Sequence, residues 1–138
     1  MNGRTRPATE ADKPFLSWLE EACMREYAVA LWGAWRPRPL DEQVPDGCRI
    51  IVEGEESVGC VTTIARPDHV WVDQLYIAAK FQRRGIGSTA LRMILSEAAA
   101  MGVPVRLSVI ATNPALDFYL SHGFRIHEET SERRIMTT

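Results

Sequence analysis

The stretch Val70-Trp-Val-Asp-Gln-Leu-Tyr-Ile77 is joined by a short Ala-Ala-Lys-Phe connection to Gln82-Arg-Arg-Gly-Ile-Gly-Ser88. Its first part is β-branched and aromatic, which is typical of a strand. The two glycines allow a turn whose backbone N–H groups face one side, because glycine has no Cβ. The amphipathic run that follows predicts a helix, and the first N–H groups and the dipole of a helix attract anions. With two arginines at its rim, this stretch predicts a phosphate site.

The two glycines, with Ala90, also match the G-x-G-x-x-G/A pattern of dinucleotide-binding proteins. In those proteins the turn leaves its strand almost at once, and an acidic residue closes the next strand. Here residues 78–82 intervene, and the next predicted strand, 105–110, ends without an acid. The dinucleotide interpretation is therefore disfavoured, whereas a plain helix entry with two surface arginines stays open as the structural alternative.

The longer context resembles the acetyl-CoA-binding core of the GNAT family of N-acetyltransferases. The family signature, Q/R-x-x-G-x-G/A, is matched by Gln82, Gly85 and Gly87. A second family feature, Asn113-Pro-Ala-Leu-Asp-Phe-Tyr-Leu-Ser-His-Gly-Phe124, lies downstream in the expected order. The close resemblance covers about residues 58–124.

This resemblance implies a single α/β (α+β) domain over residues 1–138 with the acyl-CoA N-acyltransferase fold. That fold has a mixed, mostly antiparallel sheet flanked by helices on both faces. The implied activity is direct transfer of an acetyl group from acetyl-CoA to a primary amine of a small molecule or peptide, without a metal or a covalent enzyme intermediate. The alternative is a non-catalytic acyl-CoA-binding or sensor module.

The resemblance also implies roles for particular residues. Asn113 would hydrogen-bond the pantetheine chain and could cap a helix at the same time. Backbone groups of the strand end and the glycine turn would bind the rest of the cofactor. These positions are Leu75, Tyr76, Ile77, Gln82, Arg83, Arg84, Gly85, Ile86, Gly87 and Ser88.

Two side chains are candidate catalytic residues. Tyr119 matches the family tyrosine that protonates the departing CoA thiolate; its alternative is a core tyrosine, because Leu116 and Leu120 share its helical face. Asp73 lies where some members place a carboxylate that deprotonates the amine directly or through water. Its alternative is a hydrogen-bonded carboxylate at the end of a strand.

Three aromatic residues upstream, Tyr27, Trp32 and Trp35, are candidate walls of the acceptor site. They lie near a stretch broken by glycine and proline. Aromatic anchors of a binding site and aromatic core residues look alike in sequence, so both interpretations stay open.

The composition, 46% hydrophobic and 25% charged residues in a chain of 138, is that of one soluble globular domain. A formal net charge of −2 gives no bulk attraction to nucleic acid or to an anionic membrane. No run resembles a signal peptide or approaches the ~20 apolar residues of a membrane span, so we expect a cytoplasmic protein. Three cysteines without metal or redox spacing predict reduced thiols. The identity of the amine acceptor and homodimer formation stay open.

Apolar periodicity and turn residues predict the remaining elements. We expect helices over 14–30 and 88–101, and a third capped by Asn113 and stopped by Gly123. We expect strands over 4–7, 48–53, 57–65, 70–77, 105–110, 124–129 and 133–138.

Overall fold

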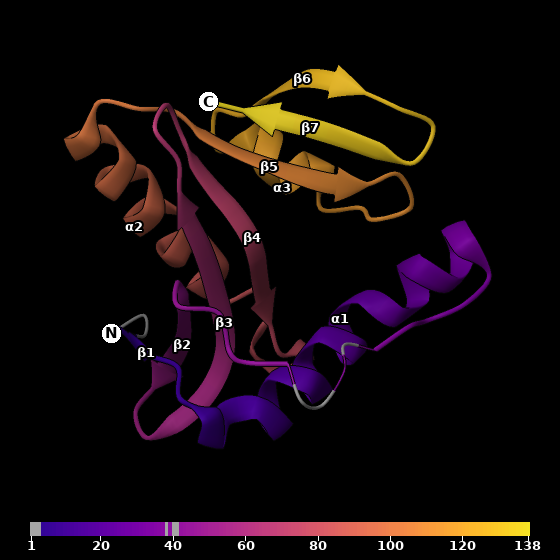
Figure 1. The fold of residues 1–138 in the computed structure, drawn as a ribbon, viewed down its shortest axis with the longest axis vertical. Coiled ribbons are helices and arrows are strands. Elements are labelled where there is room, and N and C mark those ends of the chain that lie inside the picture. Colours follow the sequence, from indigo (N-terminus) through magenta and orange to yellow (C-terminus); the bar gives the residue numbers. More distant parts are fainter. Residues whose placement is uncertain (1–3, 38, 40–41) are drawn as a thin grey trace.

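The computed structural model describes residues 4–37, 39 and 42–138. These residues form one sheet of seven strands, in the order β1-β2-β3-β4-β5-β7-β6, together with α-helices that pack against it (Figure 1). The elements are β1 (Arg4–Pro7), α1 (Lys13–Trp32), β2 (Cys48–Glu53), β3 (Glu56–Ala65), β4 (Val70–Ile77), α2 (Ile86–Met101), β5 (Val105–Ile110), α3 (Leu116–Ser121), β6 (Arg125–Glu129) and β7 (Arg133–Thr137).

The sheet is mixed, as expected. β4 and β5 run parallel, because α2 carries the chain back across the sheet between them, whereas the neighbouring strands elsewhere are antiparallel. The predicted strand boundaries agree with the observed ones to within about one residue.

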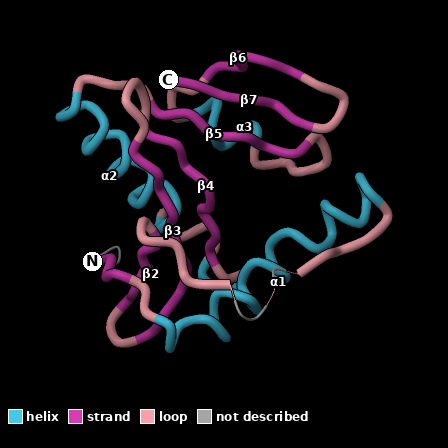
Figure 2. Tube along the Cα trace, in the orientation of Figure 1, coloured by secondary structure: helices cyan, strands magenta, loops and turns pink. Residues whose placement is uncertain are grey.

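Helices cover both faces of the sheet, which also confirms the expectation (Figure 2). On one face, Gln74 of β4 donates a hydrogen bond to Glu20 of α1. On the other, Arg49 of β2 forms a two-point ion pair with Glu97 of α2 at 2.9 and 3.0 Å. Each helix contributes fully buried leucine to one continuous core, Leu19 from α1 and Leu91 from α2.

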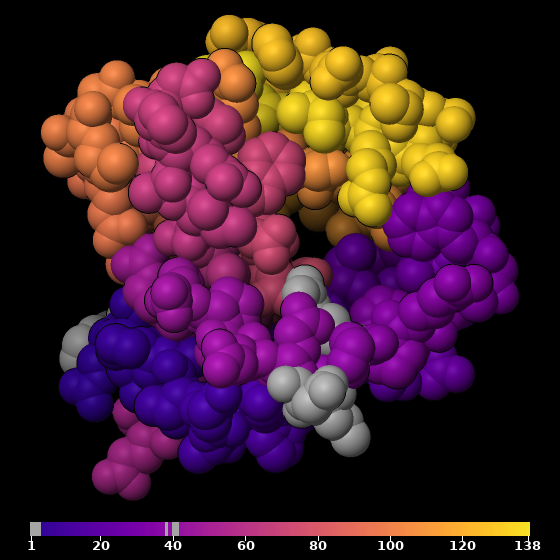
Figure 3. All heavy atoms as spheres, in the orientation of Figure 1, coloured from indigo at the N-terminus to yellow at the C-terminus, as the bar shows by residue number. Residues whose placement is uncertain are grey.

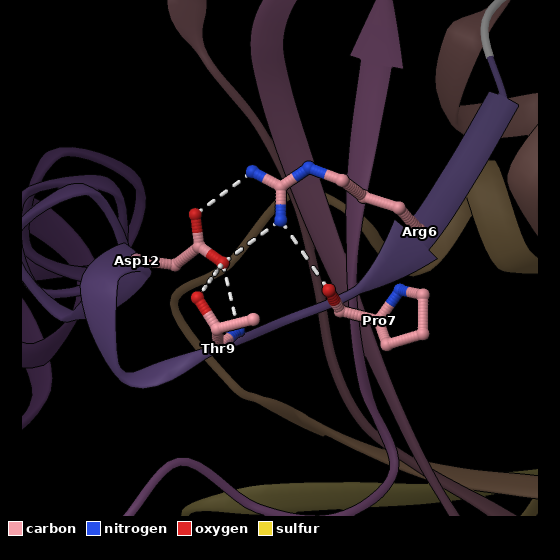
Figure 4. A network of polar contacts seen from close by, with 4 residues as sticks. All are labelled: Arg6, Pro7, Thr9 and Asp12. Atoms are coloured by element: carbon pink, nitrogen blue, oxygen red, sulfur yellow. Dashed lines mark hydrogen bonds and ion pairs between the residues drawn. The ribbon is translucent and has the colours of Figure 1, made fainter.

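A polar network fixes the start of α1 (Figure 4). The Asp12 carboxylate accepts hydrogen bonds from the Arg6 guanidinium at 2.8 and 2.9 Å and from the Thr9 backbone N–H at 2.8 Å. These donors, led by Arg6, hold the pKa of Asp12 down at about 2. The network ties β1 to the short 3-10 turn Glu10–Asp12 that precedes the helix.

Three helix boundaries differ from the sequence-based expectation. α1 continues to Trp32, where Gly33 adopts a φ of +78° and donates its N–H to the Val29 carbonyl. α2 begins at Ile86, two residues early, so Gly85 is its N-cap. α3 begins only at Leu116, so the expectation that Asn113 caps it is wrong.

Asn113 instead stabilises a turn before α3. Its Oδ1 accepts the N–H of Ala115 at 2.9 Å, two residues along the chain. Asparagine commonly forms such local turns, and this one competes with helix formation at the site. None of the helices formed by the described residues is long and apolar enough to cross a membrane.

Candidate active site

The parallel strands β4 and β5 pair over a short distance and then diverge. The paired residues are Val70 with Val105, Trp71 with Arg106 and Val72 with Leu107. Beyond them β4 continues along β3, whereas β5 continues along β7. The divergence opens a cleft of about 550 Å³. Figure 3 shows its mouth as a dark hollow between α1, β4 and the yellow C-terminal hairpin.

A β-bulge lies where β4 leaves β5. Thr62 of β3 faces Gln74, and Thr63 faces Val72, so Asp73 is the extra residue in the ladder. Bulges bend a strand and increase its twist, which turns the rest of β4 away from β5. Asp73 is itself exposed and lines the cleft.

The backbone of β4 after the bulge alternates between its two sides. Ala78 donates its N–H to Val58 at 2.8 Å, so Tyr76 also directs its N–H and C=O toward β3. Leu75 and Ile77 direct theirs into the cleft. The expectation that Tyr76 offers backbone groups to a ligand is therefore corrected to Leu75 and Ile77 alone.

The Ile77 carbonyl already has two donors at the end of β4. The Gln82 side-chain Nε2 lies 2.8 Å from it, and the Cys23 thiol lies 3.5 Å from it. The burial of Cys23 raises the pKa of its thiol to about 11, which keeps the thiol protonated at neutral pH. Gln82 thus fixes the strand end, leaving the Leu75 groups and the Ile77 N–H directed toward the cleft.

The glycine turn leads directly into the first turn of α2. Gly85 has a φ of +82° and Arg83 a φ of +64°, so two residues of this turn lie in the left-handed region. A Cβ at Gly85 would meet no atom within 4 Å, so conformation is what favours glycine there. The backbone N–H groups of Ile86, Gly87 and Ser88 stand at the start of the helix, where no intrahelical acceptor exists.

The two arginines of the turn separate. Arg83 lines the cleft, whereas the Arg84 guanidinium lies 5.5 Å from the centre of the Phe81 ring. The ammonium of Lys80, a residue that no sequence motif marked, lies 5.0 Å from the centre of the same Phe81 ring and 3.4 Å from the Glu56 carboxylate. The turn therefore carries three cations around the start of α2, of which Arg83 is directed to the cleft.

Tyr119 lies in the wall of the cleft and is almost fully buried, with 9% of its surface exposed. Its ring packs edge-on against Phe118 and Phe124, at 5.2 and 5.6 Å between centres. Burial raises the pKa of the phenol to about 12, so the hydroxyl keeps its proton across the neutral range. Tyr119 is thus a core residue and a cleft residue at once, and Asn113 lines the same wall.

The three upstream aromatics do not form one wall. Tyr27 lines the cleft, and its carbonyl accepts a hydrogen bond from the Thr112 hydroxyl at 2.6 Å. The guanidinium of Arg133 lies over the ring of Trp32, 5.5 Å from the centre of that ring. Trp35 lines a separate pocket on the α1 face of the sheet. Trp32 and Trp35 also line a further pocket together, so Tyr27 alone of the three borders the cleft.

Several cleft residues escaped the sequence analysis. Cys23 and Met24 reach it from α1, Phe118 from α3 and Arg133 from the start of β7. The apolar periodicity of α1 and α3 marks such positions as core, and nothing local distinguishes a core face from one that borders a cleft. Among the described residues, no group of three or more histidine, cysteine or acidic side chains could hold a metal ion.

The arrangement places three chemical elements in the cleft or directly beside it. The backbone groups of Leu75 that face away from β3 can bind an extended amide chain, as an added strand would. The start of α2 with Arg83 can bind a phosphate group. Tyr119 holds a proton that it can donate, and Asp73 offers a carboxylate that can accept one.

Comparison with known proteins is consistent with this architecture. The family model described as "Acetyltransferase (GNAT) family" matches residues 10–124. No curated protein sequence matches the chain significantly.

Solved structures match the whole fold. The PaiA N-acetyltransferase of Thermoplasma acidophilum, in complex with coenzyme A, has a TM-score of 0.80 at 15% identity, covering 100% of this chain and 99% of that one. An acetyltransferase of Thermus thermophilus has a TM-score of 0.77 at 20% identity, covering 100% and 97%. An Arabidopsis thaliana protein in complex with the bisubstrate analogue CoA-Ac-MVNAL has a TM-score of 0.73 at 16% identity, covering 100% and 99%. At these identities the similarity concerns the fold.

Proposed function

The chain belongs to the acetyltransferase (GNAT) family, and from this premise we propose that it transfers the acetyl group of acetyl-CoA to a primary amine. One observation carries the proposal. The side of β4 at Leu75 that faces away from β3 borders the cleft, and the chain leads from the cleft residue Arg83 directly to the helix start at Gly85. Pantetheine has amides that need the first feature, and the pyrophosphate of CoA needs the second.

The described residues fit this cofactor. Leu75 and Ile77 would pair with the pantetheine amides, and Asn113 would bind the same arm from the opposite wall. The N–H groups of 86–88, with Arg83, would bind the pyrophosphate. The relative from Thermoplasma acidophilum, solved with coenzyme A, and the Arabidopsis relative, solved with a CoA-peptide analogue, support this choice of ligand.

When bound, acetyl-CoA supplies a thioester whose carbon–sulfur bond breaks as the carbon–nitrogen bond to the amine forms. A backbone N–H of the Leu75 segment would stabilise the negative charge on the carbonyl oxygen, and the loss of one such donor typically lowers a rate by roughly 100-fold. The Asp73 carboxylate would accept the proton that the amine loses, directly or through water. The Tyr119 hydroxyl would donate a proton to the sulfur, consistent with a phenol that burial keeps protonated.

A thiol-release assay tests the proposal. The protein is incubated with acetyl-CoA and a panel of small amines and short peptides with free N-termini, and free CoA thiol is measured over time. We expect release that depends on the amine and on Tyr119. Acetyl-CoA binding without release for any amine would contradict transfer and would favour an acyl-CoA-binding module.

A further inference from the structure

The cleft is bordered from both faces of the sheet. Cys23, Met24 and Tyr27 reach it from α1 on one face, and Phe118 reaches it from α3. A Cβ at Gly87, in the first turn of α2, would lie 3.7 Å from the Phe118 ring, so α3 and the start of α2 share the other face. Because the phosphate site lies at the start of α2, the opening on the α1 face is left for the acceptor.

One cation lies at the opening on the α1 face. Arg133 begins β7, lines the cleft and pairs with Ile110 of β5. Its guanidinium lies 5.5 Å from the centre of the Trp32 ring, and Trp32 belongs to α1, so the Arg133 side chain is directed to the α1 face. Arg83, the other cation among the described residues that line the cleft, belongs to the glycine turn that leads into α2.

The charge of Arg133 is not neutralised by a carboxylate among the described residues. Its neighbour Arg134 is, because the Nε of Arg134 lies 2.7 Å from the Glu129 carboxylate. Successive residues of a strand point to opposite faces, so the two arginines lie on different sides of β7. The Trp32 ring supports the Arg133 guanidinium without supplying an anion, which leaves the N–H groups at the guanidinium edge for a ligand.

A carboxylate is the ligand that fits this guanidinium. The planar guanidinium presents parallel N–H groups that match the two oxygens of a carboxylate. A single positive charge is also balanced by a single negative charge, whereas the start of α2 offers several N–H groups to phosphate. A second ammonium group on the acceptor would meet the like charge of Arg133.

We propose that Arg133 selects the acceptor, and that the acceptor is a small amine that carries a carboxylate. The carboxylate binds the Arg133 guanidinium on the α1 face, and the amine extends into the cleft toward Leu75. This inference rests on the proposed acetyl transfer and adds to it the class of acceptor. Diamines, and amino acids whose carboxylate is blocked as an amide, are weaker acceptors on this basis.

A series of amino acids of increasing length tests the class of acceptor. Glycine, β-alanine, 4-aminobutanoate and 6-aminohexanoate are each compared with their own carboxamide, with kcat/KM referred to the unprotonated amine. At the best length the acid should exceed its amide by about tenfold, as expected for one charge-assisted pair, and the ratio should fall with added salt. Ratios that do not exceed one at any length would overturn the proposal.

Two matched variants on β7 test the location. Arg133→Gln and Arg134→Gln remove the same charge from adjacent positions on opposite sides of the strand. The ratio of acid to amide should be lost in Arg133→Gln and kept in Arg134→Gln. Arg133→Lys keeps the charge without the planar guanidinium and should retain part of the ratio. Equal losses in the two Gln variants would indicate an effect of net charge and would refute a site at Arg133.

Binding titrations without turnover separate the two proposals. Each acid of the series and its amide are titrated into the wild type and both Gln variants in the presence of CoA, and the heat is measured. At least one acid should bind wild type and Arg134→Gln about tenfold more tightly than Arg133→Gln, whereas the amides should not discriminate. If no amine is acetylated, acetyl transfer fails, and this pattern still decides the carboxylate site; its absence refutes the site.

Discussion

Replacing Gly85 with Asp would test the phosphate site, and Gly102→Asp is its control at the other end of α2. Both glycines have left-handed φ values, +82° and +71°, and a Cβ at either would meet nothing within 4 Å. Replacing either glycine should therefore lower the free energy of unfolding by a similar amount, roughly 1 kcal/mol, because the new residue must adopt a left-handed backbone conformation. Aspartate at the helix start interacts favourably with the dipole and at the end unfavourably, so Gly102→Asp should be the less stable variant.

CoA binding should rank the two variants in the reverse order: Gly85→Asp should bind CoA more weakly than Gly102→Asp does. An added negative charge about 6 Å from a phosphate raises the free energy of binding by about 1–3 kcal/mol, depending on the effective dielectric, which corresponds to a 5- to 150-fold weaker complex. Gly102→Asp adds the same charge at the far end of a helix of 16 residues and should bind CoA like wild type. Calorimetric titration at low and high salt measures both, and the difference should shrink with salt. Wild-type affinity in folded Gly85→Asp would refute a phosphate site at the start of α2.

Three further changes have defined outcomes. Tyr119→Phe should lower kcat at least tenfold with little change in CoA affinity. Because the pKa of Tyr119 is raised to about 12, the contribution of its protonated hydroxyl to the free energy of unfolding is complete below pH ~10 and is lost as the pH rises through 12. Denaturant titrations of the Phe variant should not show this decrease at high pH. Trp35→Ala should raise the acceptor KM and leave the acetyl-CoA KM nearly unchanged. Trp18→Ala, at an exposed position, should alter neither KM. Equal changes in both KM values would indicate that Trp35 only packs against its neighbours. Asp12→Asn should remove about 1 kcal/mol that wild type gains above pH ~4 and loses as the pH falls through 2, and an unchanged acid titration would argue against the pairing with Arg6.

Much of the fold follows from local patterns in the chain. Alternating and β-branched runs mark the strands, and glycines mark the ends of α1 and α2, because both signals depend on neighbours in sequence. The boundaries that differ have local causes as well. Asn113 competes with helix formation through its own side chain, and α1 gains a further half-turn before Gly33 ends it.

The site depends on contacts that no local pattern encodes. The divergence of β4 from β5 requires the bulge at Asp73, which is set by pairing with β3. The Glu20–Gln74 contact joins residues 54 positions apart. The periodicity of the sequence places Glu20 on a helix and Gln74 on a strand, but it does not show that the two are in contact. The separation of Trp35 from Tyr27 likewise follows from where the chain turns after α1.

α1 spans both parts of the divided sheet. Near its start it contacts β4 through Glu20, and near its end it is attached to the other part by the Thr112–Tyr27 hydrogen bond and the Arg133–Trp32 contact. A helix of 20 residues transmits displacement along roughly 30 Å with little bending. A ligand that shifts one end of α1 would therefore change the position of the residues at its other end. Thermodynamic linkage would then make any two ligands that shift this helix change each other's affinity by one common factor.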